Sequence, residues 1–358
     1  MSFYSELQLN QAGSKKLIRE CTSRKEKAYH MAVYAFKIFV TLAFCFFFVA
    51  GFSMLFGNDN SPAGVVILLM VMVFKNADFS ADSKHSVGIM AIMYAVMTVC
   101  PYIANQLGSI PAFFINIASV AVMVILGCHN PIMSNQSTIV LGYLLLYGYP
   151  VTGEVYKMRV FGMIAGAVIT VLVFYRNHKK VCCDTKIHNI IKEFDLSTDR
   201  SRWQFTLIIS IPLAMLITEL LGFNRSMWAG IAVMSVIAPQ ISGKKMRMKL
   251  RIIGNIFGGA LFFVLYKFLP ATLYANIGLL GGLGVGLSAN YGWQAVFNTF
   301  GALAIATEAF GLSNAISLRI FMTVFAVIFA IVMCTVIEII LDKMIKVEKE
   351  NKTDITHP

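Results

Sequence analysis

The feature that most constrains the fold of this chain is a series of apolar segments separated by short polar turns. Hydrophobic residues make up 58% of the 358 residues and charged residues only 13%, a composition far from that of soluble proteins. Continuous apolar runs predict helices that cross a bilayer, whereas a transmembrane barrel would show alternating segments of about ten residues. We therefore expect an all-α membrane protein. The segments lie at 31–56, 62–74, 86–106, 110–127, 136–149, 156–175, 204–222, 227–241, 250–269, 272–289, 293–308 and 315–341.

Several of these segments are shorter than the about 20 residues that a helix perpendicular to the bilayer needs to cross its hydrocarbon core. A short segment such as 136–149 must pack against other helices or lie where the bilayer is thinned. Prolines such as Pro101 and Pro212 mark either loops or broken helices. The predicted number of spans is therefore about 12, with ten as the lower alternative.

Basic residues predict the orientation. The first 30 residues, the 75–85 loop, the 176–202 linker, the 242–251 loop and the tail after Leu341 hold 24 of the 30 Lys and Arg residues. Because cytoplasmic loops are enriched in Lys and Arg, we expect both termini in the cytoplasm and the protein in the inner membrane. The net charge of +12 then follows from topology and does not indicate nucleic-acid binding.

The two halves of the chain resemble each other. With an offset of 166 residues, Ala63 and Gly64 align with Ala229 and Gly230, and Arg159 and Arg319 lie in similar stretches at an offset of 160. We therefore expect two parallel repeats of about six helices each, as some transporters have. The predicted organisation is a basic segment 1–30, a first repeat 31–175, a cytoplasmic linker 176–203, a second repeat 204–341 and a tail 342–358.

A helix-packing motif opens one helix of the second repeat. Arg251, Gly254 and Gly258 follow one another in RIIGNIFGG, and glycines at this spacing lie on one helix face and let another helix approach closely. Arg251 ends a basic run, so it is either a topological anchor or a residue of the pore.

The two-repeat layout, the RIIGNIFGG motif and the AG-containing helix before it resemble the fusaric-acid-resistance (FUSC) and aromatic acid exporter superfamily. Plant aluminium-activated malate channels look like distant relatives. The family pattern places Thr where this chain has Asn255. Many of these exporters carry a large cytoplasmic domain, for which the 176–203 linker is too short, and this chain is closer to small members that act beside a periplasmic adaptor protein.

Ionisable residues within apolar segments indicate functional positions, because they cost at least about 2.5 to 3.5 kcal/mol on insertion scales. A group of ionisable residues lies near the expected outer ends of the helices, within or beside these segments, and predicts an outer gate or vestibule held by ion pairs. Its members are Arg159, Glu219, Arg225, Lys267, Glu308 and Arg319.

Two of these residues, Arg159 and Arg319, occupy equivalent positions in the two repeats. A pair of guanidinium groups can clamp a carboxylate through paired hydrogen bonds; the alternative is that each anchors a helix end at the lipid headgroups. Trp293 and Asn298 lie in a stretch that mixes polar and aromatic residues, which makes 293–308 the best candidate for a wall facing the substrate.

No constellation of residues indicates an enzyme. The six histidines are dispersed and the seven cysteines lack metal-ligand spacing, so we expect neither a metal nor a cofactor. The resemblance implies export of weak aromatic or other organic acids, with Glu219 or Glu308 as the residue that exchanges a coupling proton. The expected partners are the lipid bilayer, a small organic anion, a periplasmic adaptor and further copies of the chain. A passive organic-anion channel and a non-transporting scaffold or sensor are the alternatives.

Overall fold

The computed structural model describes residues 3–9, 11–179, 185–237, 244–270, 281, 284, 288 and 290–355, and in these residues all regular structure is helical. Every expected apolar segment corresponds to a helix except 272–289, nearly all of which lies outside the described residues. The all-α prediction is confirmed. The longer helices are α3 (Arg24–Phe56), α5 (Ser83–Gln106), α6 (Ser109–Gly127), α8 (Gly153–His178), α10 (Asp199–Leu220), α12 (Lys244–Phe268), α15 (Tyr291–Phe310) and α16 (Leu312–Ile355).

Within the described residues, seven helices are long and apolar enough to cross a membrane, namely all of those above except α15. Three further apolar helices are short: α4 (Ser61–Phe74), α7 (Gln136–Gly148) and α11 (Met227–Val236). These helices make the chain a multi-pass membrane protein. The twelve-span count, the two repeats and the cytoplasmic termini stay predictions.

The chain divides into two compact units. Unit 1 comprises residues 1–48 and 246–321, and unit 2 comprises residues 49–245 and 322–358. This division cuts across the two predicted repeats, because α10 and α11 of the second repeat pack against α6 and α7 of the first.

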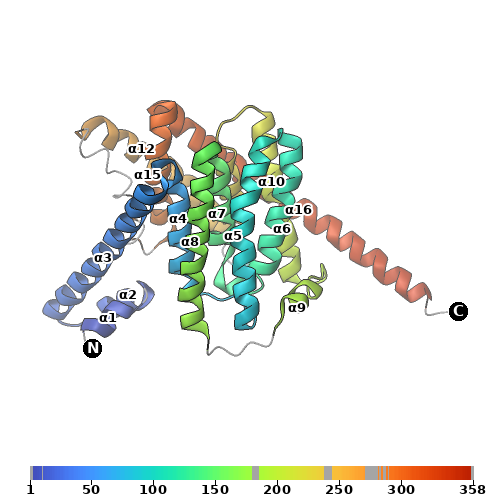
Figure 1. Cartoon of the computed structure of the whole chain (residues 1–358), viewed down its shortest axis with the longest axis horizontal. Coiled ribbons are helices and arrows are strands. Elements are labelled where there is room, and N and C mark those ends of the chain that lie inside the picture. The colour runs from blue at the N-terminus through green and yellow to red at the C-terminus, as the bar shows by residue number, and fades with distance from the viewer. Residues whose placement is uncertain are drawn as a thin grey trace. The chain divides into compact units, whose positions relative to one another are not determined.

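The short helices form the centre of unit 2. Helix α7 contacts α4, α5, α6 and α11, and α5 and α4 in turn contact α8. Figure 1 shows α4, α5, α6, α7 and α8 running side by side. Tyr143 of α7 and Met70 of α4 are completely buried. A helix of 13 residues, such as α7, is too short to face lipid along a complete span, so its apolar side chains are shielded by the long helices around it.

Glycine allows the closest approach in this centre. A Cβ atom at Gly142 would lie 2.9 Å from both Met97 Sδ and Val66 Cγ1, closer than van der Waals contact allows. Glycine at this position of α7 therefore brings α4 and α5 against the same turn.

Unit 1 contains the glycine motif. A Cβ atom at Gly254 would lie 2.7 Å from Ala295 Cβ, and one at Gly258 would lie 2.7 Å from the carbonyl oxygen of Val296. The backbones of α12 and α15 thus lie directly against each other along this face.

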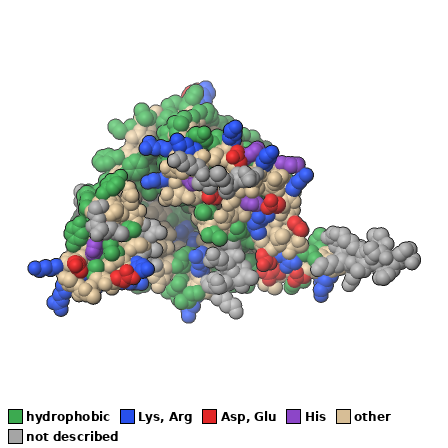
Figure 2. Space-filling model, turned by 90° about the horizontal axis from the view of Figure 1, so that it is seen from below, with side chains coloured by type: hydrophobic (Ala, Val, Ile, Leu, Met, Phe, Trp, Pro, Cys, Tyr) green, Lys and Arg blue, Asp and Glu red, His purple; other side chains and the backbone are tan. Residues whose placement is uncertain are grey.

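Three short α-helices and two 3-10 helices, η1 (Asn58–Asn60) and η2 (Pro131–Met133), complete the described residues. Helices α1 (Phe3–Gln8) and α2 (Gln11–Glu20) precede α3. Helix α9 (Ile187–Lys192) lies in the linker that joins α8 to α10 and contacts α6. Figure 2 looks onto the end of unit 2 that carries α9, where charged and histidine side chains gather.

Candidate functional site

The carboxyl-terminal end of α7 is a meeting point of polar side chains from three other segments. Asn105 of α5 donates to the carbonyl of Tyr147 at 3.0 Å, Arg225 donates to the carbonyl of Gly148, and Arg159 of α8 donates to the carbonyl of Tyr149 at 2.8 Å. These carbonyls have no partner within their own helix. Two cations at the negative end of the helix also complement its dipole.

Arg159 is the most buried charged group at this place, with 4% of its surface exposed. Its Nε donates to Asn60 Oδ1 at 2.9 Å and its Nη2 to the carbonyl of Asp59 at 3.3 Å, in addition to the bond to Tyr149. This burial is incompatible with an anchor at the lipid headgroups. The guanidinium group has five N–H bonds, of which these contacts use three, so two remain for a ligand.

Asn60 explains why Arg159 is held so firmly. This residue is fully buried and precedes α4, and its Nδ2 donates to the carbonyls of Phe56 and Val155 at 2.8 and 3.0 Å. Its amide oxygen then accepts from Arg159. The side chain therefore joins the end of α3, the start of α4 and the start of α8 to one guanidinium group.

Arg159 lines a cavity of about 320 Å³ between α5, α8 and the turn that follows α7. Tyr102 and Tyr156 form one wall: their rings stack with centroids 3.7 Å apart and planes inclined by 12°. The Tyr156 hydroxyl donates to the carbonyl of Thr98 at 3.3 Å, which fixes the ring. Asn105 and Thr98 also line the cavity. The result is a cation, an aromatic wall and neutral polar groups around one space.

Glu219, near the end of α10, lies on the other side of the α7 terminus. One of its carboxylate oxygens accepts from the Tyr147 hydroxyl and from the Ser226 hydroxyl, each at 2.7 Å. Arg225 is close in sequence to Ser226, and its guanidinium group also stacks over the Tyr149 ring at 4.4 Å. Arg225 has a positive φ of 64°, a conformation that is uncommon for a residue with a side chain.

The structure therefore brings together three of the predicted site residues, Arg159, Glu219 and Arg225, around residues 147–149. The other candidates belong to unit 1. There Lys267, Trp293 and Asn298 are exposed, and Arg319 is buried with 7% of its surface exposed. Glu308 lies in α15, but its side chain is outside the described residues.

The helix-packing residue Arg251 is half-buried in α12, and the carbonyl of this residue accepts from Asn255 Nδ2 at 2.8 Å. The Oδ1 atom of Asn255 in turn accepts from the Thr299 hydroxyl of α15 at 3.1 Å. In unit 1, polar contacts thus accompany the glycine faces that join α12 to α15.

Sequence reasoning missed Tyr102, Tyr156, Asn105, Tyr147 and Asn60. Asn60 and Asn105 could have been found from the sequence, because an amide side chain beside an apolar segment needs a hydrogen-bond partner. Among the described residues, no three His, Cys, Asp or Glu side chains are grouped so that they could hold a metal ion.

Residues 213–333 match the family model described as fusaric acid resistance protein-like. The match supports membership of the fusaric-acid-resistance superfamily. The matched residues run from within α10 into α16, so they include Glu219, Arg225 and the glycine motif but not Arg159. No curated protein and no solved structure gives a match. The resemblance to plant malate channels stays a prediction.

Proposed function

We propose that this fusaric-acid-resistance superfamily member exports small organic anions across the inner membrane, and that the anion binds in the cavity beside Arg159. The observation that carries the proposal is the guanidinium group itself. It is held by Asn60, Asp59 and Tyr149, and Arg159 lines a cavity.

The geometry favours a carboxylate over other ligands. A guanidinium group offers parallel donors that match the two oxygens of a carboxylate. Because its partners are neutral oxygens, the positive charge of Arg159 is not cancelled by a carboxylate in direct contact. An anion that entered the cavity would supply the missing charge.

The aromatic wall favours a planar acid. Stacked or edge-on aromatic contacts contribute about 0.5–1.5 kcal/mol beyond the burial of area. The rings of Tyr102 and Tyr156 are already stacked, so little conformational entropy is lost when a ligand ring packs against them. An aromatic carboxylic acid would therefore use both the cation and the wall.

We further propose that Glu219 exchanges the coupling proton, with Glu308 as the second candidate. The contacts of Glu219 support this role. Its carboxylate accepts a hydrogen bond from the Tyr147 hydroxyl, and the backbone carbonyl of Tyr147 accepts one from the cavity residue Asn105. A change of charge on Glu219 would act on the same turn of α7 that holds Arg159. A periplasmic adaptor and an oligomeric assembly complete the proposal.

Flux through proteoliposomes that contain the full chain tests the binding site. We expect saturable efflux of labelled benzoate by the wild-type protein and loss of saturation with Arg159→Gln. Arg159→Lys should give an intermediate Michaelis constant, because lysine keeps the positive charge but lacks the parallel N–H donors of the guanidinium group. Lys157→Gln is the matched control, because Lys157 lies on the same helix but is exposed and forms its ion pair with Glu154. Unchanged benzoate kinetics in Arg159→Gln would refute the site.

The same vesicles separate an exporter from its alternatives. A proton-coupled exporter moves benzoate against its gradient when a pH gradient is imposed, and loses this ability when both Glu219 and Glu308 are replaced by Gln. A passive channel gives currents that reverse with the benzoate gradient and ignore the pH gradient. A scaffold or sensor gives no flux in any condition.

A further inference from the structure

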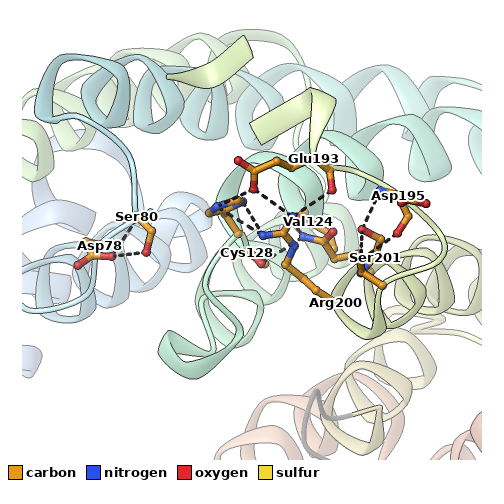
Figure 3. A network of polar contacts seen from close by, with 11 residues as sticks. Asp78, Ser80, Val124, Cys128, Glu193, Asp195, Arg200 and Ser201 are labelled. Atoms are coloured by element: carbon orange, nitrogen blue, oxygen red, sulfur yellow. Dashed lines mark hydrogen bonds and ion pairs between the residues drawn. The ribbon is translucent and has the colours of Figure 1, made fainter. Parts of the chain in front are cut away.

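His129 lies between two charged residues at the end of unit 2 that carries α9. It follows α6 and precedes η2 (Pro131–Met133). Its Nδ1 is 3.2 Å from Arg200 Nη1 of α10, and its Nε2 is 3.6 Å from the carboxylate of Glu193. Arg200 Nη2 also donates to the carbonyl of Glu193 at 3.1 Å and lies 3.4 Å from its carboxylate. Figure 3 shows Arg200 reaching toward Glu193.

The contact with Arg200 favours a neutral imidazole. Arg200 Nη1 lies 3.2 Å from Nδ1 and 3.5 Å from Nε2 of the ring, and a guanidinium group can only donate hydrogen bonds. A protonated ring has two N–H groups and offers no lone pair to this donor. Protonation would therefore place two cations side by side in a setting where only 12% of the histidine side chain is exposed.

Few other charges act on this ring. Residues 120–135 contain no Asp, Glu, Lys or Arg. Asp78, in the loop that Asn135 contacts, has its carboxylate bonded to Ser80, and Figure 3 shows this pair apart from Arg200. Helix α5, which packs on α6, carries Lys84 and His85 in its first turn. Burial lowers the pKa of His129, the charge of Arg200 lowers this pKa further, and Glu193 acts in the opposite direction.

The cluster holds the linker segment 185–198 in place. Within this segment Ile190 is 2% exposed, and the carbonyl of Thr185 accepts from the backbone N–H of Asp82 at 2.9 Å. Beyond Ile190, the side-chain contacts of Glu193 with His129 and Arg200 join the end of α9 to α6 and α10. The linker is the covalent connection between α8 and α10, so its position affects both helices.

We propose that His129, Arg200 and Glu193 form a pH-sensitive latch that docks the linker segment 185–198 when His129 is neutral and releases it when His129 is protonated.

The direction of the pH dependence of docking follows from proton linkage. The docked state disfavours the charged ring, so it binds fewer protons than the released state. Docking is therefore complete above the ordinary histidine pKa of about 6.5 and weakens as the pH falls below it, by up to about tenfold in the docking equilibrium constant per pH unit. A carrier of weak acids meets such acidification when its substrate enters a cell and ionises there; this link to physiology rests on the proposed function, whereas the latch does not.

Hydrogen–deuterium exchange of the full-length protein in lipid nanodiscs tests the latch without any transport assay. The protection of 185–198 is measured between about pH 5.5 and 7.5, a range that spans the ordinary histidine pKa, and is corrected for intrinsic exchange at each pH. We expect up to about tenfold less protection per pH unit below about 6.5 in the wild-type protein. His129→Gln, whose amide oxygen still accepts from Arg200 but which does not titrate, should remove this dependence.

Two further variants make the outcome decisive. His188→Gln is the matched control, because His188 is an exposed histidine on α9 itself, and it should leave the pH dependence unchanged. Arg200→Gln should reduce the dependence, because burial then disfavours the charged ring without the added charge of Arg200, while Glu193 acts in the opposite direction; this variant also tests the latch if His129→Gln does not fold. A pH dependence that persists in His129→Gln, that disappears in His188→Gln, or that is as large in Arg200→Gln as in the wild-type protein overturns the proposal.

Discussion

The Tyr147 hydroxyl donates a hydrogen bond of 2.7 Å to the Glu219 carboxylate and so joins the end of α7 to the end of α10. A carboxylate in contact with a hydroxyl group makes a stronger hydrogen bond than a neutral pair does. The same residue, Tyr147, is bonded through its carbonyl to Asn105 of the cavity wall. The carboxylate and the cavity are therefore connected through one residue.

Replacing Tyr147 by Phe should lower stability by about 1.5–3 kcal/mol, the contribution of a hydrogen bond to a charged group. The double substitution with Glu219→Gln should cost less than the sum of the single substitutions, because the two residues share the bond. Thermal unfolding of the four proteins in the same detergent measures this coupling. Strict additivity would show that the bond is not formed.

Replacing Asn60 by Leu should destabilise the protein by about 1–3 kcal/mol or more, because two buried carbonyls and Arg159 Nε lose their partner. The substitution should also raise the Michaelis constant for benzoate, since Arg159 is no longer held at the cavity. Asn314→Leu, which removes an exposed amide bonded to the carbonyl of Phe310, is the comparison. Equal changes in stability and in the Michaelis constant for the two substitutions would contradict the role of Asn60 in holding Arg159 at the cavity.

Replacing Tyr156 by Ala should selectively weaken the binding of aromatic substrates. The loss of an aromatic contact of about 0.5–1.5 kcal/mol corresponds to about 2- to 12-fold in affinity. Benzoate flux should therefore show a higher Michaelis constant while acetate flux changes little. Tyr175→Ala, on the same helix but 50% exposed, should affect neither; equal losses for benzoate and acetate in Tyr156→Ala would argue against an aromatic wall.

Replacing Gly258 by Val should separate α12 from α15, because a Cβ at this position would lie 2.7 Å from the carbonyl oxygen of Val296. Overpacking of this kind costs about 1–3 kcal/mol. Gly301→Val is the control, since a Cβ there meets nothing within 4 Å. Unfolding temperatures of the two variants should differ clearly, and similar values would mean that the two helices are not in close contact.

Much of the helical framework could be predicted from the sequence, because apolar runs with polar turns leave few alternatives in a membrane. The shortness of 136–149 favoured packing against other helices, but its apolar composition did not indicate which helices would surround α7. The contacts of α10 and α11 with α6 and α7 also cross the boundary between the predicted repeats. Such contacts depend on tertiary packing, which hydropathy does not encode.

The candidate site was predictable only in part. The sequence predicts Arg159 as a site residue because it is a cation in an apolar segment. Its partners Asp59 and Tyr149 contribute backbone carbonyls, which no sequence pattern predicts. Tyr102 and Tyr156 belong to different helices, and their stacking depends on how α5 packs against α8. The aromatic wall therefore became visible only in three dimensions.

The shortness of α11 has a consequence for how the protein is made. Its ten residues extend about 15 Å, half of the about 30 Å thickness of the hydrocarbon core, so lipid alone cannot hold it across the bilayer. It packs against α7 and α10, which are both synthesised earlier. During biogenesis the stable insertion of α11 therefore requires that α7 and α10 have already assembled. A delay in their assembly would leave α11 accessible to the quality-control proteases of the membrane.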